Sequence, residues 1–460
     1  MKSTLLATTA LFTLLTLGGC GEDKAAQKNG TAVPVTQSQT TAVRQTESER
    51  LKAHFEELFM RDLMDSPESQ TRHGIKKDYG KWDVRTEEKA ATDHAKFIND
   101  LKTLKSDYDY EKLDDATKLS YTLAERSLNE KIADYKWRHH AYPANQMFGW
   151  QSRVPSFLIN FHRVTSVDDA EAYISRLKGF KASADQHMAR MKRNQERGVL
   201  PPKFVFAYVI DDARNVMRGD PFTDGDDSAL LADFKKKIAA LNIEDEKVST
   251  DLINRATNAL MTSVKPAYED LISLARAQEA VATTDDGVWK LPDGADFYSY
   301  RLRKMTSTDM TAAEIHQLGL DEVARIHREM RDIMKKVDFE GSLQDFFEFT
   351  RTDKQFYYPE TEEGRLAYLD EAVKLIDIMK GRLDEVFITK PKADLIVIRV
   401  EAFREKSAGK AFYNRPAPDG SRPGIYYANL YKMSAMPIYQ MEALAYHEGI
   451  PGHHMQLAIM

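Results

Sequence analysis

The stretch Tyr446-His447-Glu448-Gly449-Ile450-Pro451-Gly452-His453-His454 places three histidines and a carboxylate close together near the end of the chain. Imidazoles and carboxylates are the ligands that zinc takes in proteins. The proline in this stretch cannot donate to the carbonyl four residues before it, and the two glycines tolerate unusual backbone dihedrals. The stretch therefore predicts a metal-binding helix that breaks between Gly449 and Gly452.

The spacing of the histidines requires that break. On a regular helix His453 would lie about 240° around the axis from His447, and His454 would lie about 10 Å further along it. Neither residue could then share a tetrahedral ion with His447. We predict His447 and His453 as metal ligands, with His454 as the competing choice for the second place. Glu448 is the predicted general base, which takes a proton from a water activated by the ion.

Strand patterns are confined to the last third of the chain. Leu395–Val400 is a β-branched run, and Gly424–Leu430 follows a turn-rich segment. The predicted fold is therefore mainly α, with many helices and a small antiparallel β-sheet before the metal-binding helix. In such a layout an edge strand can hold an extended peptide beside the metal through main-chain hydrogen bonds. An ordinary structural sheet is the alternative.

Most of the remaining chain has the period of amphipathic helices. A capping box at Thr311-Ala312-Ala313-Glu314 opens a helix that continues to Val337. Further helices are predicted over residues 47–64, 86–104, 114–134, 167–197, 227–240, 249–279 and 363–386. The single histidines on these segments are expected to be structural or at the surface.

The N-terminus indicates export. Lys2 precedes an apolar run from Leu5 to Leu17 that is too short to span a bilayer as a mature helix, so we predict a signal peptide. Leu17-Gly18-Gly19-Cys20 resembles the lipobox of bacterial lipoproteins, which makes Cys20 the predicted lipidation site. The protein would then be anchored in the bacterial cell envelope. Gly21, where sorting to the inner membrane would favour aspartate, predicts the outer membrane, facing the periplasm.

Composition divides the chain into four predicted parts. Residues 1–20 are the signal peptide, and residues 21–46 are a flexible tether poor in large apolar side chains. Residues 47–285 form a helical domain, and residues 286–460 form a catalytic-type helical region with the small sheet. The net charge of −6 and the absence of a long Lys/Arg run predict no nucleic-acid partner.

Several motifs resemble the family of bacterial lipoproteins catalogued only as domain of unknown function 885. They are Pro143–Gly149, Arg197–Pro202, Leu291–Gly294, Arg422–Asn429 and Tyr446–Gln456. The resemblance runs from about Glu47 to Met460. It implies a more distant similarity to the Glu-zincin metallopeptidases, and so a zincin-like architecture with one bound zinc ion. In those relatives the third metal ligand is a glutamate on a later helix.

The chain ends at Met460, whereas members of the resembled family continue beyond the equivalent point. The resemblance therefore implies that this chain is truncated at its C-terminus and lacks the third zinc ligand. We expect the full-length protein to bind zinc well and the chain as given to bind it weakly and to be inactive.

The predicted function is a membrane-anchored, zinc-dependent hydrolase that acts on oligopeptides in the cell envelope. Tyr426 and Tyr446 are candidate hydrogen-bond donors to a tetrahedral intermediate. Arg422, Tyr427 and Asn429 are candidate substrate-binding residues, and an arginine that receives a peptide carboxylate would make the enzyme a carboxypeptidase. Two alternatives remain open: a non-enzymatic helical binding or scaffold lipoprotein, and a metal-dependent hydrolase of non-peptide amides or esters.

Overall fold

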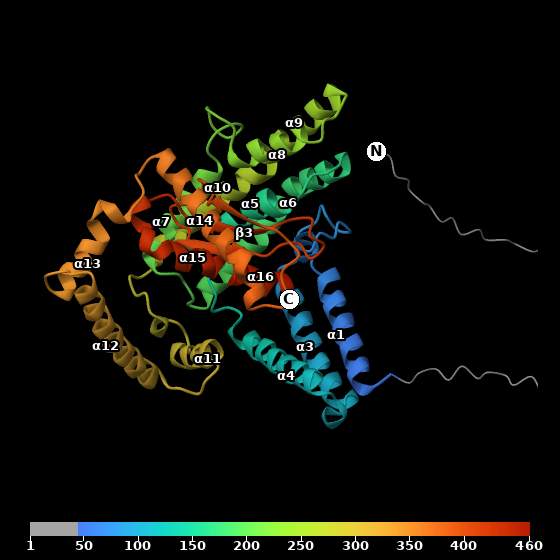
Figure 1. Cartoon of the computed structure of the whole chain (residues 1–460). Coiled ribbons are helices and arrows are strands. Elements are labelled where there is room, and N and C mark those ends of the chain that lie inside the picture. Colours follow the sequence, from blue (N-terminus) through green and yellow to red (C-terminus); the bar gives the residue numbers. More distant parts are fainter. Residues whose placement is uncertain (1–44) are drawn as a thin grey trace, which may run out of the picture. The chain divides into compact units, whose positions relative to one another are not determined.

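The computed structural model describes residues 45–460, of which Thr46–Met460 form one compact unit (Figure 1). This part of the chain is mainly helical and contains one small sheet, as predicted. The predicted signal peptide, Cys20 and nearly all of the predicted tether lie outside the described residues. No helix within residues 45–460 has the length and the hydropathy needed to cross a bilayer.

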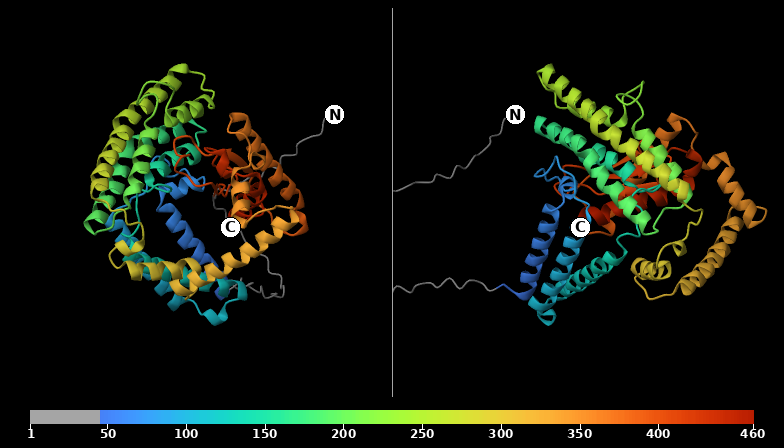
Figure 2. Two further views of the ribbon diagram at one scale, coloured as in Figure 1. Left: turned by 90° about the vertical axis from the view of Figure 1, so that its left-hand side faces the viewer. Right: turned by 180° about the vertical axis from the view of Figure 1, so that it is seen from behind.

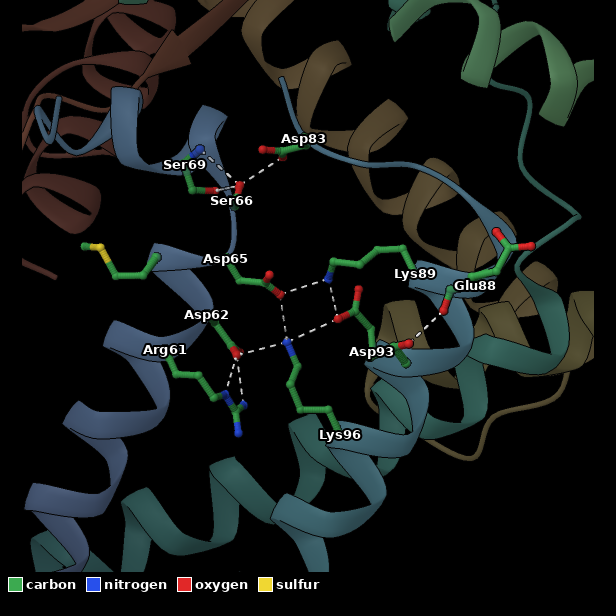
Figure 3. Close-up of polar contacts among 12 residues, drawn as sticks. Arg61, Asp62, Asp65, Ser66, Ser69, Asp83, Glu88, Lys89, Asp93 and Lys96 are labelled. Atoms are coloured by element: carbon green, nitrogen blue, oxygen red, sulfur yellow. Dashed lines mark hydrogen bonds and ion pairs between the residues drawn. The ribbon is translucent and has the colours of Figure 1, made fainter. Parts of the chain in front are cut away.

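The first helices pack through charged side chains as well as apolar ones. Lys96 of α3 forms ion pairs with Asp62 (3.2 Å) and Asp65 (3.6 Å) at the end of α1, and Lys89 pairs with Asp65 at 2.9 Å (Figure 3). A capping box between Thr46 and Glu49 opens α1 at the predicted residue. The helices of this region are α1 (Glu47–Met64), α2 (Pro67–Arg72), α3 (Glu87–Asp107) and α4 (Asp115–Asp134).

The largest hydrophobic core lies among the next six helices. They are α5 (Trp150–Phe161), α6 (Val167–Glu196), α7 (Lys203–Val216), α8 (Ala229–Ala239), α9 (Glu246–Ala259) and α10 (Lys265–Val281). The single helix predicted over residues 249–279 is two helices, joined by a π-helical turn at Leu260–Val264. Pro266, in the first turn of α10, has no N–H to continue a regular α-helical ladder, which accounts for the interruption.

The next helices are α11 (Gly294–Thr306), α12 (Ala312–Lys336), α13 (Leu343–Thr352) and α14 (Glu362–Arg382). The capping box that was predicted to open α12 is present, with Thr311 and Glu314 as its members. Most apolar side chains of α12 are half exposed, including Leu318 and Val323. The helix lies at the left-hand edge of Figure 1 and at the right-hand edge of the second view in Figure 2. Its apolar face therefore contributes little to the core within the described residues.

The sheet is mixed and not antiparallel as predicted. Its strands are β1 (Leu395–Arg399), β2 (Ala411–Asn414) and β3 (Gly424–Ala428), in the order β1-β3-β2. β3 pairs parallel with β1 and antiparallel with β2. The prediction missed β2, a four-residue strand that reverses the chain between the two predicted strands. With that reversal included, β3 enters the middle of the sheet in the direction of β1.

A second core holds the predicted metal segment in place. Tyr368, Ala372 and Ile376 of α14 are buried together with Tyr426 of β3 and Ala445 of the following helix. That helix is α15 (Met441–Glu448), and α16 (His453–Ile459) follows it. One side of α15 therefore packs against α14 and the sheet, which fixes the position of the His-Glu pair at its end.

Candidate metal centre

The helix breaks where the sequence predicted it would. α15 ends at Glu448 and α16 begins at His453. The intervening turn is closed by the Gly452 N–H, which donates to the Tyr446 carbonyl at 2.9 Å, and by the His454 N–H, which donates to the Gly449 carbonyl at 3.0 Å. A Cβ atom on Gly452 would lie 2.0 Å from the His447 carbonyl oxygen, so only glycine allows this close approach of the backbone.

The break brings a second histidine back toward the first. One ligand atom from each of His447, Glu448 and His453 lies within 4.8 Å of the other two. The rings of His447 and His453 have centroids 4.7 Å apart and planes at 71°. Among residues 45–460 neither of these two rings takes part in a hydrogen bond, so their nitrogen atoms remain available to a ligand.

Glu448 is the buried member of the group, with 6% of its surface exposed. Its Oε2 atom is buried and has no hydrogen-bond partner, which is costly for a carboxylate unless another group or ion compensates. Burial raises the pKa of Glu448, and the nearby His453 and His447 oppose that increase. Two imidazoles and an unpartnered carboxylate oxygen this close together fit a zinc ion.

His454 occupies a different environment. Its Nε2 lies 3.0 Å from the Ala393 carbonyl, which can only accept, so the proton is on Nε2. Its Nδ1 lies 2.9 Å from the Tyr413 hydroxyl, which then donates to it. Burial lowers the pKa of His454, which agrees with a neutral ring. Because both nitrogens are engaged, the structure brings His453, and not His454, to His447 and Glu448.

Tyr413 was not identified from the sequence. It lies on β2, whose four residues are too few to show a strand period, and its ring stacks 6.2 Å from that of His453. Gly424 at the start of β3 is the signal that could have revealed the contact. A Cβ there would lie 2.5 Å from both the His454 Nδ1 and the Tyr413 hydroxyl, so the glycine leaves room for this pair.

The two candidate catalytic tyrosines lie on different elements. Tyr426 is fully buried on β3, and burial, Tyr368 and the charge of Glu448 together raise its pKa. Its hydroxyl has no hydrogen-bond partner, but no part of the side chain reaches solvent. Tyr446 is half buried on α15, where burial and Glu442 raise its pKa. Tyr426 therefore interacts with the charge of Glu448, whereas Tyr446 interacts with Glu442.

The structure does not bring the candidate substrate-binding residues to the metal group. Tyr427 follows Tyr426 on β3 and so points to the other face of the sheet, where it is buried and stacks on Phe412 at 4.6 Å. Asn429 donates to three main-chain carbonyls of the segment before β2. Arg422 is 5% exposed and donates to the Arg415 and Arg72 carbonyls. All three side chains are engaged in holding the fold.

Comparisons with known proteins agree with the fold. A solved structure of a candidate lipoprotein from Colwellia psychrerythraea is similar, with a TM-score of 0.79 and 22% identity, covering 90% of this chain and 72% of that chain. A candidate lipoprotein of unknown function from Shewanella oneidensis matches with a TM-score of 0.52 and 16% identity over the same shares. None of the curated proteins matches the chain.

A model of one protein family matches most of the sequence. It covers residues 67–460, and the family is described as bacterial protein of unknown function. The match includes the candidate metal centre, the sheet and all helices from α2 onward. The chain therefore belongs to the bacterial family DUF885.

Proposed function

We propose that this protein is a zinc-dependent hydrolase that cleaves peptides, with His447 and His453 as metal ligands and Glu448 as general base. One observation carries the proposal: ligand atoms of these three residues lie within 4.8 Å of one another at a break in the helix. The zincin-like architecture that the sequence suggested is part of the same proposal. This chain and the zincin metallopeptidases would share a helix that carries His-Glu beside a small sheet.

The chemistry divides between the ion and the protein. When bound, zinc supplies Lewis acidity, which lowers the pKa of water and polarises a carbonyl group. Glu448 accepts the proton of the attacking water, and its burial supports this role because a raised pKa moves a carboxylate toward the range of a useful base. Tyr413 and the Ala393 carbonyl hold His454 in one orientation, and its backbone N–H in turn closes the turn that presents His453.

Metal content tests the ligand assignment. We expect His447→Ala and His453→Ala to lose the zinc that mass spectrometry detects in the unmutated protein. His454→Ala should retain it, as should His316→Ala, in which an exposed histidine of α12 is changed. These measurements use the full-length protein. Loss of zinc from His454→Ala with retention in His453→Ala would overturn the assignment, and absence of zinc from the unmutated full-length protein after zinc addition would overturn the proposed function.

Glu448→Gln separates a base from a ligand. The amide keeps the shape of the side chain but cannot accept the proton from water, so we expect the variant to retain zinc and to lose peptide hydrolysis. Loss of zinc together with activity would show that Glu448 is a third ligand. Hydrolysis of amides or esters without hydrolysis of peptides, by the unmutated protein, would redirect the proposal to a non-peptide substrate.

We further propose that the mature protein is anchored through a lipid on Cys20 in the bacterial cell envelope, at the outer membrane. The lipobox-like sequence that ends at Cys20 supports this, as do two structurally similar proteins described as candidate lipoproteins. Cys20→Ser should move the protein from the membrane fraction to the soluble fraction after cell lysis. An unchanged distribution would exclude lipid anchoring at this residue.

A further inference from the structure

A cavity of about 280 Å³ lies along the outer edge of β2. Three arginines contribute to its wall, and no aspartate or glutamate does. The wall residues that matter here come from α2, α5 and β2: Arg72, Arg153, Ser156, Phe412, Tyr413 and Asn414. Tyr413 belongs both to this wall and to the hydrogen bond with His454, so the cavity adjoins the candidate metal centre.

Two of the arginines in this wall have no directly bound counter-ion in the described part of the chain. Within residues 45–460 the guanidinium groups of Arg72 and Arg153 form no ion pair and no hydrogen bond. The Arg72 guanidinium lies 4.3 Å from the centre of the Phe161 ring. Burial lowers the pKa of Arg72, and the charges of Glu68 and Asp83 oppose this. Both carboxylates also pair with Arg85, Glu68 at 2.7 Å and Asp83 at 3.8 Å. An anion that entered the cavity would therefore meet two cations that no carboxylate of residues 45–460 contacts directly.

A buried hydroxyl in the same wall also lacks a partner. Ser156 is 7% exposed, and its Oγ forms no hydrogen bond. A buried polar atom without a hydrogen-bond partner destabilises the fold. A ligand that accepts a hydrogen bond from the Ser156 hydroxyl would remove this cost. Arginine guanidinium groups and a hydroxyl are the donors that recognise a carboxylate, because an arginine can donate two parallel hydrogen bonds to its two oxygens.

The edge of β2 offers main-chain groups to the same ligand. The Asn429 N–H donates to the Lys410 carbonyl at 3.0 Å, so this opposed pair is hydrogen-bonded. Hydrogen-bonded and non-hydrogen-bonded pairs alternate along an antiparallel ladder, so Phe412 and Tyr427 also form a hydrogen-bonded pair. The N–H and C=O groups of the intervening residues, Ala411 and Tyr413, therefore point away from β3. An extended peptide could pair with these groups as an added strand.

We propose that this cavity is a substrate subsite that binds a peptide carboxylate: Arg72 and Arg153 receive the carboxylate, Ser156 donates to it, and the peptide backbone lies along β2 toward the metal centre. The subsite rests on the proposed function and names the class of peptide that the enzyme selects. A free C-terminal carboxylate and an acidic side chain share the required chemistry. Arg404 is bound to Glu401 and stacked over Phe412, so it shapes the wall without receiving the ligand.

Binding to the metal-free protein tests the subsite separately from catalysis. The probes are three short alanine peptides labelled at the N-terminus: one with a free C-terminal carboxylate, its C-terminal amide, and the amide with one internal glutamate. Fluorescence anisotropy with chelator-treated protein should show one of the two carboxylate peptides binding at least about tenfold more tightly than the plain amide. The preferred peptide identifies the source of the carboxylate.

Two arginine variants and a matched control make the result specific. Arg153→Gln and Arg72→Gln should each remove most of the preference for the carboxylate. Arg153 is exposed, so its variant should fold even if Arg72→Gln is destabilised. Arg328→Gln removes an exposed arginine of α12 without an ion pair in the described residues, and it should leave the preference unchanged. Equal affinity for the three peptides, no binding of any, or a preference that survives Arg153→Gln would overturn the subsite.

The subsite and the proposed function can fail independently. Zinc-dependent hydrolysis of all three peptides at equal rates would retain the hydrolase and reject the subsite. Tight, arginine-dependent binding of a carboxylate peptide without hydrolysis in the presence of zinc would retain the subsite and reject the hydrolase.

Discussion

Replacing Gly452 by alanine should destabilise the fold and disrupt the candidate metal centre. The new methyl carbon would lie 2.0 Å from the His447 carbonyl oxygen and 2.4 Å from that of Tyr446. Both are backbone atoms, so the contact cannot be relieved by a change of rotamer. The turn between α15 and α16 must open instead, and the hydrogen bond from the Gly452 N–H to the Tyr446 carbonyl, 2.9 Å long, would then be lost.

The cost follows from these two effects. Inserting a methyl group into a closely packed site costs about 1–3 kcal/mol, and a lost main-chain hydrogen bond costs about 1 kcal/mol more. The free energy of unfolding should therefore fall by about 2–4 kcal/mol. Moving the turn also moves His453 relative to His447, and displaced support of a ligand typically costs about 10–100-fold in metal affinity.

Urea denaturation followed by circular dichroism gives the free energy of unfolding, and competition with a chromogenic chelator gives the zinc affinity. Gly319→Ala is the matched control, because its methyl group would meet no atom within 4 Å on α12. That variant should be more stable by about 0.5–1 kcal/mol, the usual gain for alanine over glycine inside a helix. A Gly452→Ala protein with unchanged stability and zinc affinity would refute the steric argument.

Three further perturbations test the energetics of the fold. Burial raises the pKa of Asp212 to about 6, so the folded chain holds a proton that the unfolded chain releases near pH 4; stability should fall by up to about 3 kcal/mol as the pH rises from about 4 to about 6. Urea titrations across this range should show a smaller fall for Asp212→Asn, and an identical fall would assign it to other groups. Tyr413→Phe removes the hydroxyl bound to His454 and should lower the free energy of unfolding by about 0.5–1.5 kcal/mol, whereas equal stability would show that this bond has no net value. Arg176 is fully buried and donates to several carbonyl and side-chain acceptors, so Arg176→Met should lower the free energy of unfolding by about 3–5 kcal/mol. Lys96→Met, in the surface network of Figure 3, should lower it by less than about 1 kcal/mol. Similar costs for these last two variants in urea would contradict the role of burial.

Local signals located most of the helices. The capping box at Thr311 and the apolar period after it define α12, and α1 has the predicted limits. The prediction missed α2, α5, α7, α11 and α13. Nine-tenths or more of the surface of Leu158 and of most α5 side chains is buried, so α5 shows no polar face, and Pro155 inside it is a further signal against a helix. Periodicity identifies helices with one polar face, and it gives little signal for a helix such as α5 that is buried on most sides.

The candidate site was predictable in part. Three of the residues proposed for it, His447, Glu448 and His453, come together because the break in the helix is encoded locally by glycine and proline. The choice between His453 and His454 was not local. It depends on Tyr413 of β2 and the carbonyl of Ala393, which engage the second histidine from more than thirty residues away in the sequence.

The sequence by itself determined the helical class, the break in the candidate metal segment and the family, because these depend on residue types and short spacings. The tertiary structure decided the mixed sheet, the separation of His454 from the metal group, and the cavity that unites Arg72 and Arg153 with β2. Those features depend on which distant segments pack together. A single sequence carries little signal for such pairings. They are selected by the free energy gained when the whole core is buried, and this cannot be read from short spacings.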